Sequence, residues 1–369
     1  MAWQYAIKRR TLHFHEPAGT SRGVYTTRTV WYVVLFDMAA GVFGVGECAP
    51  LPALSPELPT AEEGNLNALE ARLEEATRAF VAGACTSAAI PEGTPSSIRM
   101  ALETAHLHVK TKSVRFFKTP FARGEEDIAI NGLVWMGDKK TMVRRMEEKL
   151  EQGFSCIKCK IGGIDFESEL EMLGILRSLA PDPQKVELRL DANGAFAPEE
   201  ADKKLEALAK FSPHSIEQPI RKGQWQEMAR LCKTSPIPIA LDEELIGVPR
   251  RERLKLVEEI APAYFVLKPS LHGGFKGCEQ WIDLAIMSGA GFWVTSALES
   301  NIGLNAIAQW CGTLDCPLPQ GLGTGKLFSD NCEIMPVHIV GTALHCDPFA
   351  HEPDLLAWLG LGMLSFLGS

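Results

Sequence analysis

The chain has 369 residues, of which 46% are hydrophobic, and its formal net charge is −9. This length lies between one large domain and two ordinary ones, so we expect a barrel-sized unit with a smaller companion. Like charges do not cluster in blocks, which argues against a nucleic-acid-binding surface. No run approaches the roughly 18 apolar residues of a membrane span, and no signal-peptide layout begins the sequence. We therefore expect a cytoplasmic protein without nucleic-acid or membrane partners; the oligomeric state stays open.

The 10 cysteines are scattered without the spacing of a disulfide framework, so reduced thiols are expected. Cys156 and Cys159 form a C-x-x-C pair inside a predicted strand. Side chains three residues apart on a strand point to opposite faces, so this pair is not expected to bind zinc.

The first third of the chain predicts an α+β unit. Residues 25–50 contain two β-rich runs around a glycine-containing turn, which is typical of antiparallel strands. Residues 61–80 and 96–110 have helical spacing of Leu and Ala. We assign residues 1–120 to this unit and expect 331–369, including the apolar C-terminal segment, to complete it.

From about residue 126, short apolar strands alternate with amphipathic helices. The predicted strands are 128–135, 155–162, 186–193, 214–220, 236–243, 264–270, 291–300 and 317–323, with helices that include 139–152, 198–211, 249–260 and 276–289. This alternation is typical of βα units around a parallel sheet. Eight strands favour a closed barrel over an open doubly wound sheet, and we assign residues 121–330 to it.

Polar residues lie at the C-terminal ends of five consecutive predicted strands, where barrel enzymes keep their active sites. In chain order these residues are Lys158 with Lys160, Asp191, Glu217, Asp242 and Lys268. The last four are 25 or 26 residues apart, about one βα unit each, so they should lie at the same height. Three carboxylates are thus expected to converge between two sources of positive charge.

Carboxylates without a soft ligand favour a hard cation, and Mg²⁺ is the expected ion, with Mn²⁺ as a substitute. Such an ion would hold a substrate carboxylate and stabilise the enediolate left when an adjacent C–H loses its proton. Lys158 and Lys160 share one face of their strand. A lysine base needs a pKa below its usual value of about 10.4, and a second ammonium and a dication both act in that direction. Singly, a Lys-x-Lys pair is more often a solvated barrel-mouth pair; the regular set of six is what indicates a site.

This set of residues resembles the enolase superfamily, specifically its muconate-lactonizing-enzyme subgroup, over nearly the whole chain. The resemblance implies a modified (β/α)7β barrel of TIM type with an α+β N-terminal capping domain. It also implies that Asp191, Glu217 and Asp242 bind the metal, that Lys160 transfers the proton and Lys158 tunes it, and that Lys268 acts from across the barrel. Sites of this superfamily are known to use a Lys or His base with Mg²⁺.

Five strings are most similar to the o-succinylbenzoate synthase family within that subgroup: GECAPLP at 46–52, INGLVWMG at 130–137, LRLDANGAF at 188–196, TSALESNIGL at 295–304 and QGLGTGKLF at 320–328. Such enzymes remove water from 2-succinyl-6-hydroxy-2,4-cyclohexadiene-1-carboxylate in menaquinone biosynthesis. The resemblance implies that Lys160 takes the proton α to the ring carboxylate and returns it to the departing hydroxide, while Lys268 stabilises the anion.

Two alternatives stay open. The first is an isomerase on the same scaffold, either an N-acylamino-acid racemase or a dipeptide epimerase, with Lys160 and Lys268 as opposed bases. A dipeptide epimerase would often show Asp-x-Asp on the last barrel strand, which QGLGTG lacks. The second is a catalytically silent barrel that serves as a binding or scaffold protein.

Further substrate contacts are expected from Asn193 and Arg189, although Arg189 fits a structural ion pair inside the barrel equally well. Ser296 and Glu299 end the seventh strand, and the backbone amides of Gly321 and Gly323 are candidates for the succinyl carboxylate. Ser21 and Arg22 lie in the glycine-rich segment 18–23. The resemblance implies that this segment closes over the site as a lid, and a plain hairpin connection fits it equally well. His272 is expected on a loop surface, and His13 and His15 on a strand.

Overall fold

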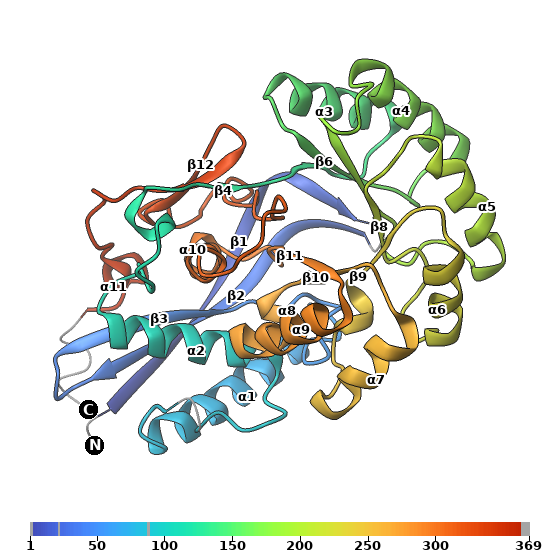
Figure 1. Ribbon diagram of the computed structural model, residues 1–369. Coiled ribbons are helices and arrows are strands. Elements are labelled where there is room, and N and C mark those ends of the chain that lie inside the picture. Colours follow the sequence, from blue (N-terminus) through green and yellow to red (C-terminus); the bar gives the residue numbers. More distant parts are fainter. Residues whose placement is uncertain (1–2, 21–22, 87–88, 363–369) are drawn as a thin grey trace.

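The computed structural model describes residues 3–20, 23–86 and 89–362 (Figure 1). Its N-terminal unit is a three-stranded antiparallel sheet, β1 (Trp3–Thr20), β2 (Gly23–Asp37) and β3 (Val42–Cys48), packed with helices α1 (Glu63–Ala82) and α2 (Ser96–Thr111). The antiparallel strands and both helices predicted here are present. Residues 363–369 of the apolar C-terminal segment lie outside the described residues.

The second half of strand β2, from Val30 to Phe36, is buried on both faces, which explains its nearly continuous hydrophobic sequence. Trp31, Val33 and Leu35 pack in the same core cluster as residues of α1 and α2. The alternate residues of β2, such as Tyr32, pack in a second cluster that includes Leu298 from the barrel segment. The strand therefore ties the N-terminal helices to the barrel.

Helix α2 approaches β3 so closely that two strand positions have no room for a side chain. A Cβ atom at Gly46 would lie 2.0 Å from the carbonyl oxygen of Ala101, and one at Gly44 would lie 2.2 Å from that of Ala105. Glycine at these positions lets helix backbone rest on strand backbone. This close packing fixes α2 against the sheet.

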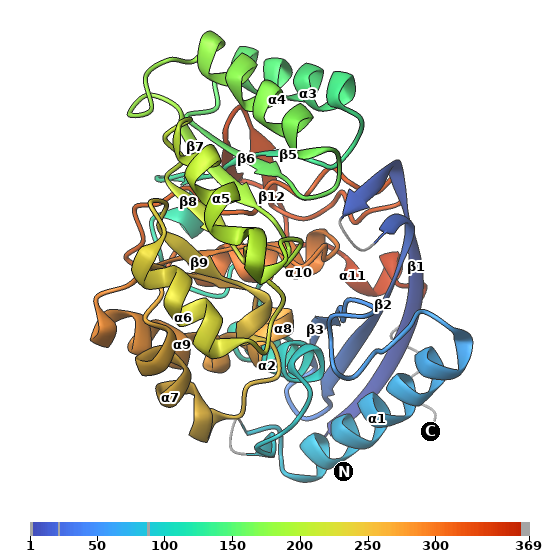
Figure 2. The same cartoon turned by 90° about the vertical axis from the view of Figure 1, so that its right-hand side faces the viewer.

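The barrel strands form one parallel sheet in sequence order. They are β5 (Gly132–Val134), β6 (Cys156–Lys160), β7 (Glu187–Asp191), β8 (Ser215–Glu217), β9 (Ile239–Leu241), β10 (Tyr264–Leu267) and β11 (Gly291–Val294). The helices that connect or follow them are α3 (Lys139–Glu151), α4 (Phe166–Leu179), α5 (Pro198–Ala209), α6 (Trp225–Thr234), α7 (Arg250–Ile260), α8 (Pro269–His272), α9 (Gly274–Ser288) and α10 (Asn301–Cys311). Figure 2 shows α3 to α7 following one another around the outside of the strands.

Residues 320 and 321 form an eighth, very short strand segment that closes the barrel. Gln320 forms a parallel bridge with Ile130 beside β5, and Gly321 forms one with Thr295 at the end of β11. The amide of Gly321 donates to the carbonyl of Val294 at 2.8 Å. Pro317 and Pro319 precede this pair and have no N–H to donate, which keeps the strand segment short. The predicted (β/α)7β barrel is confirmed.

The last segment returns to both parts of the fold. Strands β12 (Val337–Val340) and β13 (Ala343–Cys346) form a small antiparallel sheet with β4 (Ile128–Ala129). Leu355 and Leu356 of α11 (Leu355–Trp358) pack in the cluster that contains one face of β2. The proposed domain boundaries therefore remain a prediction.

Within 3–20, 23–86 and 89–362, no helix has the length and apolar character to cross a membrane.

Candidate active site

The strand register brings the first half of the site together. Lys160 on β6, Asp191 on β7 and Glu217 on β8 are successive register partners across the sheet. Lys158 lies two residues before Lys160, so strand alternation sends both side chains to one face. The C-terminal ends of three adjoining strands thus carry two amino groups and two carboxylates at one level.

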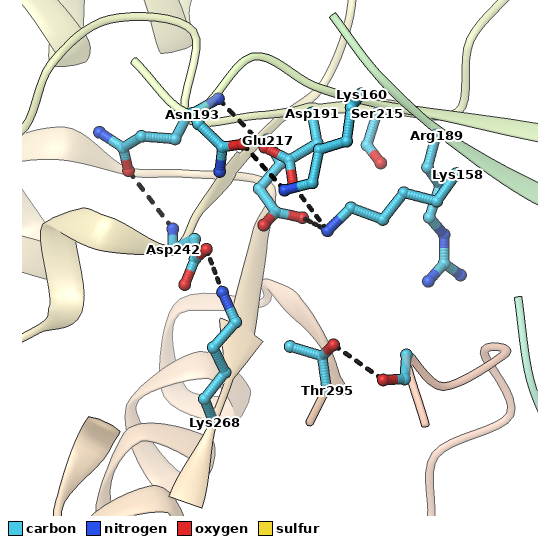
Figure 3. Close-up of polar contacts among 12 residues, drawn as sticks. Lys158, Lys160, Arg189, Asp191, Asn193, Ser215, Glu217, Asp242, Lys268 and Thr295 are labelled. Atoms are coloured by element: carbon cyan, nitrogen blue, oxygen red, sulfur yellow. Dashed lines mark hydrogen bonds and ion pairs between the residues drawn. The ribbon is translucent and has the colours of Figure 1, made fainter. Parts of the chain in front are cut away.

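The two lysines share one carboxylate oxygen (Figure 3). Asp191 Oδ2 lies 2.8 Å from Lys158 Nζ and 2.6 Å from Lys160 Nζ. Lys158 also donates to Glu217 Oε2 at 2.6 Å, and Lys160 donates to Asn193 Oδ1 at 2.8 Å. The opposing ammonium groups are therefore held together by the carboxylates between them.

Asp242 and Lys268 supply the second half. Asp242 follows β9, Lys268 follows β10, and the Lys268 amino group donates to Asp242 Oδ2. Figure 3 shows Lys268 reaching Asp242 from one side of the cluster and Lys158 reaching Glu217 from another. The backbone N–H of Lys268 donates to Nδ1 of His272 at 2.9 Å. This bond anchors the turn that carries the lysine.

All three carboxylates are buried, with exposed fractions of 0% for Asp191 and 1% for Glu217 and Asp242. Burial raises the pKa of Glu217 well above its ordinary value, and the neighbouring charge of Asp191 adds to the shift. Burial also opposes ionisation of the two aspartates, but their lysine partners outweigh it and lower the pKa of Asp191 and of Asp242. The aspartates are therefore anionic at neutral pH.

The pKa values of Lys158 and Lys268 are set mainly by their carboxylate partners. Burial alone lowers the pKa of Lys158, but Asp191 and Glu217 outweigh burial and raise it above the ordinary value. The pKa of Lys268 is likewise raised, because Asp242 outweighs burial. The like charge of Lys158 opposes that rise only weakly. The second ammonium alone is thus insufficient to make either group a free base.

The chemistry of the donors suits a hard divalent cation. Glu217 Oε1 and Asp242 Oδ1 are buried oxygens without a hydrogen-bond partner in the part of the chain that the structure describes. No group of three or more His, Cys, Asp or Glu among those residues is already spaced to hold a metal ion. The amino groups of Lys158 and Lys268 occupy carboxylate oxygens instead. A dication would compete for those oxygens and would shift the lysine pKa values downward.

A cavity opens beside this cluster. At its charged end it is lined by Lys158, Lys160, Asn193, Asp242, Glu243 and Lys268. Its apolar side is formed by Tyr25, Leu51, Leu54, Leu133, Trp135 and Leu298. The remaining polar lining includes Asn131, Thr295, Ser296 and Thr324. The arrangement suits a small molecule with an apolar part and a polar end.

Two of the predicted substrate contacts differ in position. Asn193 lines the cavity and bridges Lys160 to Glu243, whose Oε1 accepts from Asn193 Nδ2 at 3.0 Å. Arg189 is not among the cavity-lining residues. Its guanidinium pairs with Glu187 at 2.6 Å and lies 4.3 Å from the centre of the Trp293 ring. The structural ion pair, the alternative left open for Arg189, is the arrangement found.

The two predicted contacts that follow β11, Ser296 and Glu299, have different positions relative to the cavity. Ser296 lines the cavity, whereas Glu299 is buried behind it and accepts from Ser296 Oγ at 2.6 Å and from Ser270 Oγ at 2.6 Å. Gly321 and Gly323 both line the cavity. The Gly321 amide is used in closing the barrel, so the expectation that it receives a substrate carboxylate is wrong. Ser21 and Arg22 lie outside the described residues.

His272 is not on a loop surface as expected. It is 2% exposed at the end of α8, and burial lowers its pKa to about 3, which leaves it neutral. Its neutral ring accepts the Lys268 N–H, a role that depends on backbone geometry rather than on a sequence pattern. Leu133 and Trp135 also line the cavity although they were not among the predicted contacts; their alternation with Asn131 on one strand is the sequence signal that indicates them.

Comparison with known proteins places these features in a family. Residues 141–337 match the family described as enolase C-terminal domain-like. The chain is 44% identical over 353 residues to the o-succinylbenzoate synthase of Desulfotalea psychrophila, which covers 89% of this chain and 95% of that protein.

Solved structures agree. The crystal structure of MenC from D. psychrophila superimposes with a TM-score of 0.79 at 38% identity, covering 94% of this chain and all of that one. A dipeptide epimerase from Cytophaga hutchinsonii, solved in complex with Mg and a dipeptide, has a TM-score of 0.78 and covers 94% of each chain. At 20% identity the epimerase shows a shared fold only.

Proposed function

The chain belongs to the o-succinylbenzoate synthase family of the enolase superfamily, and on this premise we propose that it dehydrates 2-succinyl-6-hydroxy-2,4-cyclohexadiene-1-carboxylate to o-succinylbenzoate. The reaction is a syn elimination in menaquinone biosynthesis, so the protein is a carbon–oxygen lyase. The observation that carries the proposal is the 44% identity to a curated synthase along almost the whole chain. The buried lysine and carboxylate cluster supplies the chemistry.

The residues of this chain divide the work between removing a proton and stabilising charge. Lys160 takes the proton from the carbon that bears the ring carboxylate, and the electron pair left behind expels hydroxide from the neighbouring carbon. Lys160 then returns the proton to the hydroxide, so that water leaves and the ring becomes aromatic. Lys268 stabilises the anion from the other face, and Lys158 contacts the ring carboxylate.

Asp191, Glu217 and Asp242 are the residues proposed to hold Mg²⁺, for which Mn²⁺ can substitute. When bound, the ion supplies positive charge to the substrate carboxylate as the adjacent proton leaves. Among the residues that the structure describes, Glu217 Oε1 and Asp242 Oδ1 are buried without a hydrogen-bond partner. A hard dication would satisfy both oxygens, which supports this assignment.

The isomerase remains the second candidate, because a pair of lysines flanking the carboxylates also suits a racemase. The sequence identity to an epimerase is 25% over 309 residues, whereas the identity to the synthase is 44% over 353 residues. The apolar side of the cavity, with Trp135 and four leucines, also favours a carbocyclic ring over a dipeptide. These observations support the dehydratase.

The test is an absorbance assay of the purified protein with Mg²⁺ and the cyclohexadiene substrate, with N-succinylamino acids examined in parallel by polarimetry. The proposal expects aromatisation of the first and at most slow racemization of the second. Racemization without dehydration would transfer the assignment to the isomerase. Absence of both reactions would favour the scaffold alternative. The cytoplasmic location and the small-molecule carboxylate as sole partner class are proposed with the activity.

A further inference from the structure

Residues 296–300 form a turn beside the cavity, and side chains of the N-terminal unit form hydrogen bonds with its backbone. We call it the wall turn, because Ser296, Ala297 and Leu298 line the cavity. Leu298 has φ +63°, a left-handed conformation that a branched apolar residue adopts only when its surroundings impose it. The contacts of the wall turn show what imposes it.

Arg28, on β2 of the N-terminal unit, is 3% exposed and donates to four backbone carbonyls. Two belong to the wall turn: Nε lies 3.2 Å from Leu298 O and Nη2 lies 3.1 Å from Ala297 O. The other two belong to Ala49 and Pro50, with Nη2 2.7 Å from Ala49 O. One guanidinium therefore joins two backbones that are far apart in sequence.

The two joined backbones each carry a part of the apolar side of the cavity. Leu51 follows Pro50 directly, and Leu298 is itself one of the acceptors; both line the cavity. Neither segment carries Lys160 or the three carboxylates proposed to bind metal. The distance between Leu51 and Leu298 is therefore determined by segments other than those that carry the reacting groups.

The amides of the wall turn are held by carboxylates in a complementary way. Glu47, also from the N-terminal unit, accepts from Ser300 N and Gly303 N, each at 2.8 Å. Glu299 accepts from Ala297 N at 2.7 Å. The guanidinium of Arg28 therefore binds carbonyls of the wall turn, while Glu47 and Glu299 bind its amides, and together these contacts restrain the turn.

We propose that Arg28 is a positioning residue for the substrate: it fixes the distance between Leu51 and Leu298 and thereby sets how tightly the apolar ring is held beside Lys160. This inference rests on the proposed function. If Arg28 served stability alone, its loss would lower the melting temperature without changing substrate binding. The two roles are therefore separable by kinetics.

The chain offers a matched control in Arg177 on α4. Its guanidinium also donates to four backbone carbonyls, including Phe211 O at 2.7 Å and Val186 O at 2.9 Å. Val186 precedes β7, so Arg177 lies at the end of the barrel opposite Asp191. Arg177→Met removes the same number of bonds without touching the cavity.

The experiment compares wild type, Arg28→Met, Arg28→Lys and Arg177→Met by steady-state dehydration kinetics and thermal unfolding. Arg28→Met should raise KM about tenfold with a smaller change in kcat, and Arg28→Lys should give an intermediate KM because its amine reaches fewer carbonyls. Arg177→Met should lower the melting temperature while KM stays within about twofold of wild type.

Unchanged KM in folded Arg28→Met would overturn the inference, and so would an equal rise in Arg177→Met. If Arg28→Met fails to fold, the KM of Arg28→Lys decides alone. A wild-type protein without turnover would contradict the proposed function and this inference with it. If the wild-type protein catalyses dehydration and the Arg28 variants keep its KM, only the inference about Arg28 would be contradicted.

Discussion

Lys160 and Asp191 are register partners on neighbouring strands, and the amino group of Lys160 lies 2.6 Å from Asp191 Oδ2. The same carboxylate oxygen lies 2.8 Å from the amino group of Lys158. One buried carboxylate oxygen therefore contacts both lysines. A cation that binds Asp191 would compete with both amino groups for that oxygen.

Replacing Lys160 should abolish dehydration with little loss of structure. Lys160→Ala removes the proposed base, and kcat should fall by at least about 10³-fold. The Tm should change little, because Lys158 still pairs with Asp191. Steady-state kinetics with circular dichroism checks both points, with Lys185→Ala on the exposed surface as control. Substantial turnover by Lys160→Ala would remove the residue from the mechanism.

Mg²⁺ should stabilise the protein through Asp191. At a Mg²⁺ concentration about 100 times the dissociation constant, the wild-type Tm should rise by roughly 4 °C, and a chelator should reverse both this rise and the activity. Asp191→Asn should lose the Mg²⁺-dependent rise, while exposed Asp283→Asn should keep it. Scanning fluorimetry measures each case. An undiminished rise in Asp191→Asn would place the metal elsewhere.

Acid should destabilise the protein partly through His108 on α2. Burial lowers the pKa of this histidine to about 4, and its Nδ1 accepts from Val45 N at 3.1 Å. Between pH 6.5 and 4 the unfolded chain binds more protons than the folded chain, so the free energy of unfolding falls as pH falls. The contribution over the whole window is roughly 3 kcal/mol.

Urea unfolding at a series of pH values tests this contribution. His108→Asn keeps an acceptor for the Val45 N–H but does not titrate, so its stability should depend less on pH across that window. His272, which is also buried and neutral, remains in both proteins and cancels in the comparison. Parallel pH profiles for wild type and variant would contradict the prediction.

Arg189 should matter for stability rather than for substrate. Arg189→Met removes the ion pair with Glu187 and the contact with Trp293, which should cost about 2 kcal/mol, less than a fully buried pair because Glu187 is partly exposed. KM should stay within about twofold of wild type. Chemical denaturation and kinetics measure the two effects. A large rise in KM would restore Arg189 as a substrate contact.

The barrel and its polar strand ends could be predicted because each follows from a local pattern repeated along the chain. The spacing of 25 or 26 residues between Asp191, Glu217, Asp242 and Lys268 is the length of one βα unit, and a parallel sheet brings equal positions to equal height. The register of β6, β7 and β8 realises this expectation.

Features that depend on contacts between distant segments could not be predicted. Arg189 shares a strand face with Asp191, but each residue adds about 3.3 Å along a strand, so the arginine lies a layer lower, against Trp293. The Gly321 amide donates to the Val294 carbonyl where the barrel closes, and His272 is buried where it accepts the backbone N–H of Lys268. The apolar side of the cavity draws on residues as far apart as Leu51 and Leu298, which no periodicity connects.

A crystal structure of the protein with Mg²⁺ and o-succinylbenzoate bound would show whether the buried cluster binds the metal and the substrate as proposed. We expect one ion coordinated by Asp191, Glu217 and Asp242 and by the ring carboxylate, with the amino groups of Lys160 and Lys268 on opposite faces of the ring. An ion bound away from these carboxylates, or a ring that does not lie between the two lysines, would contradict this expectation.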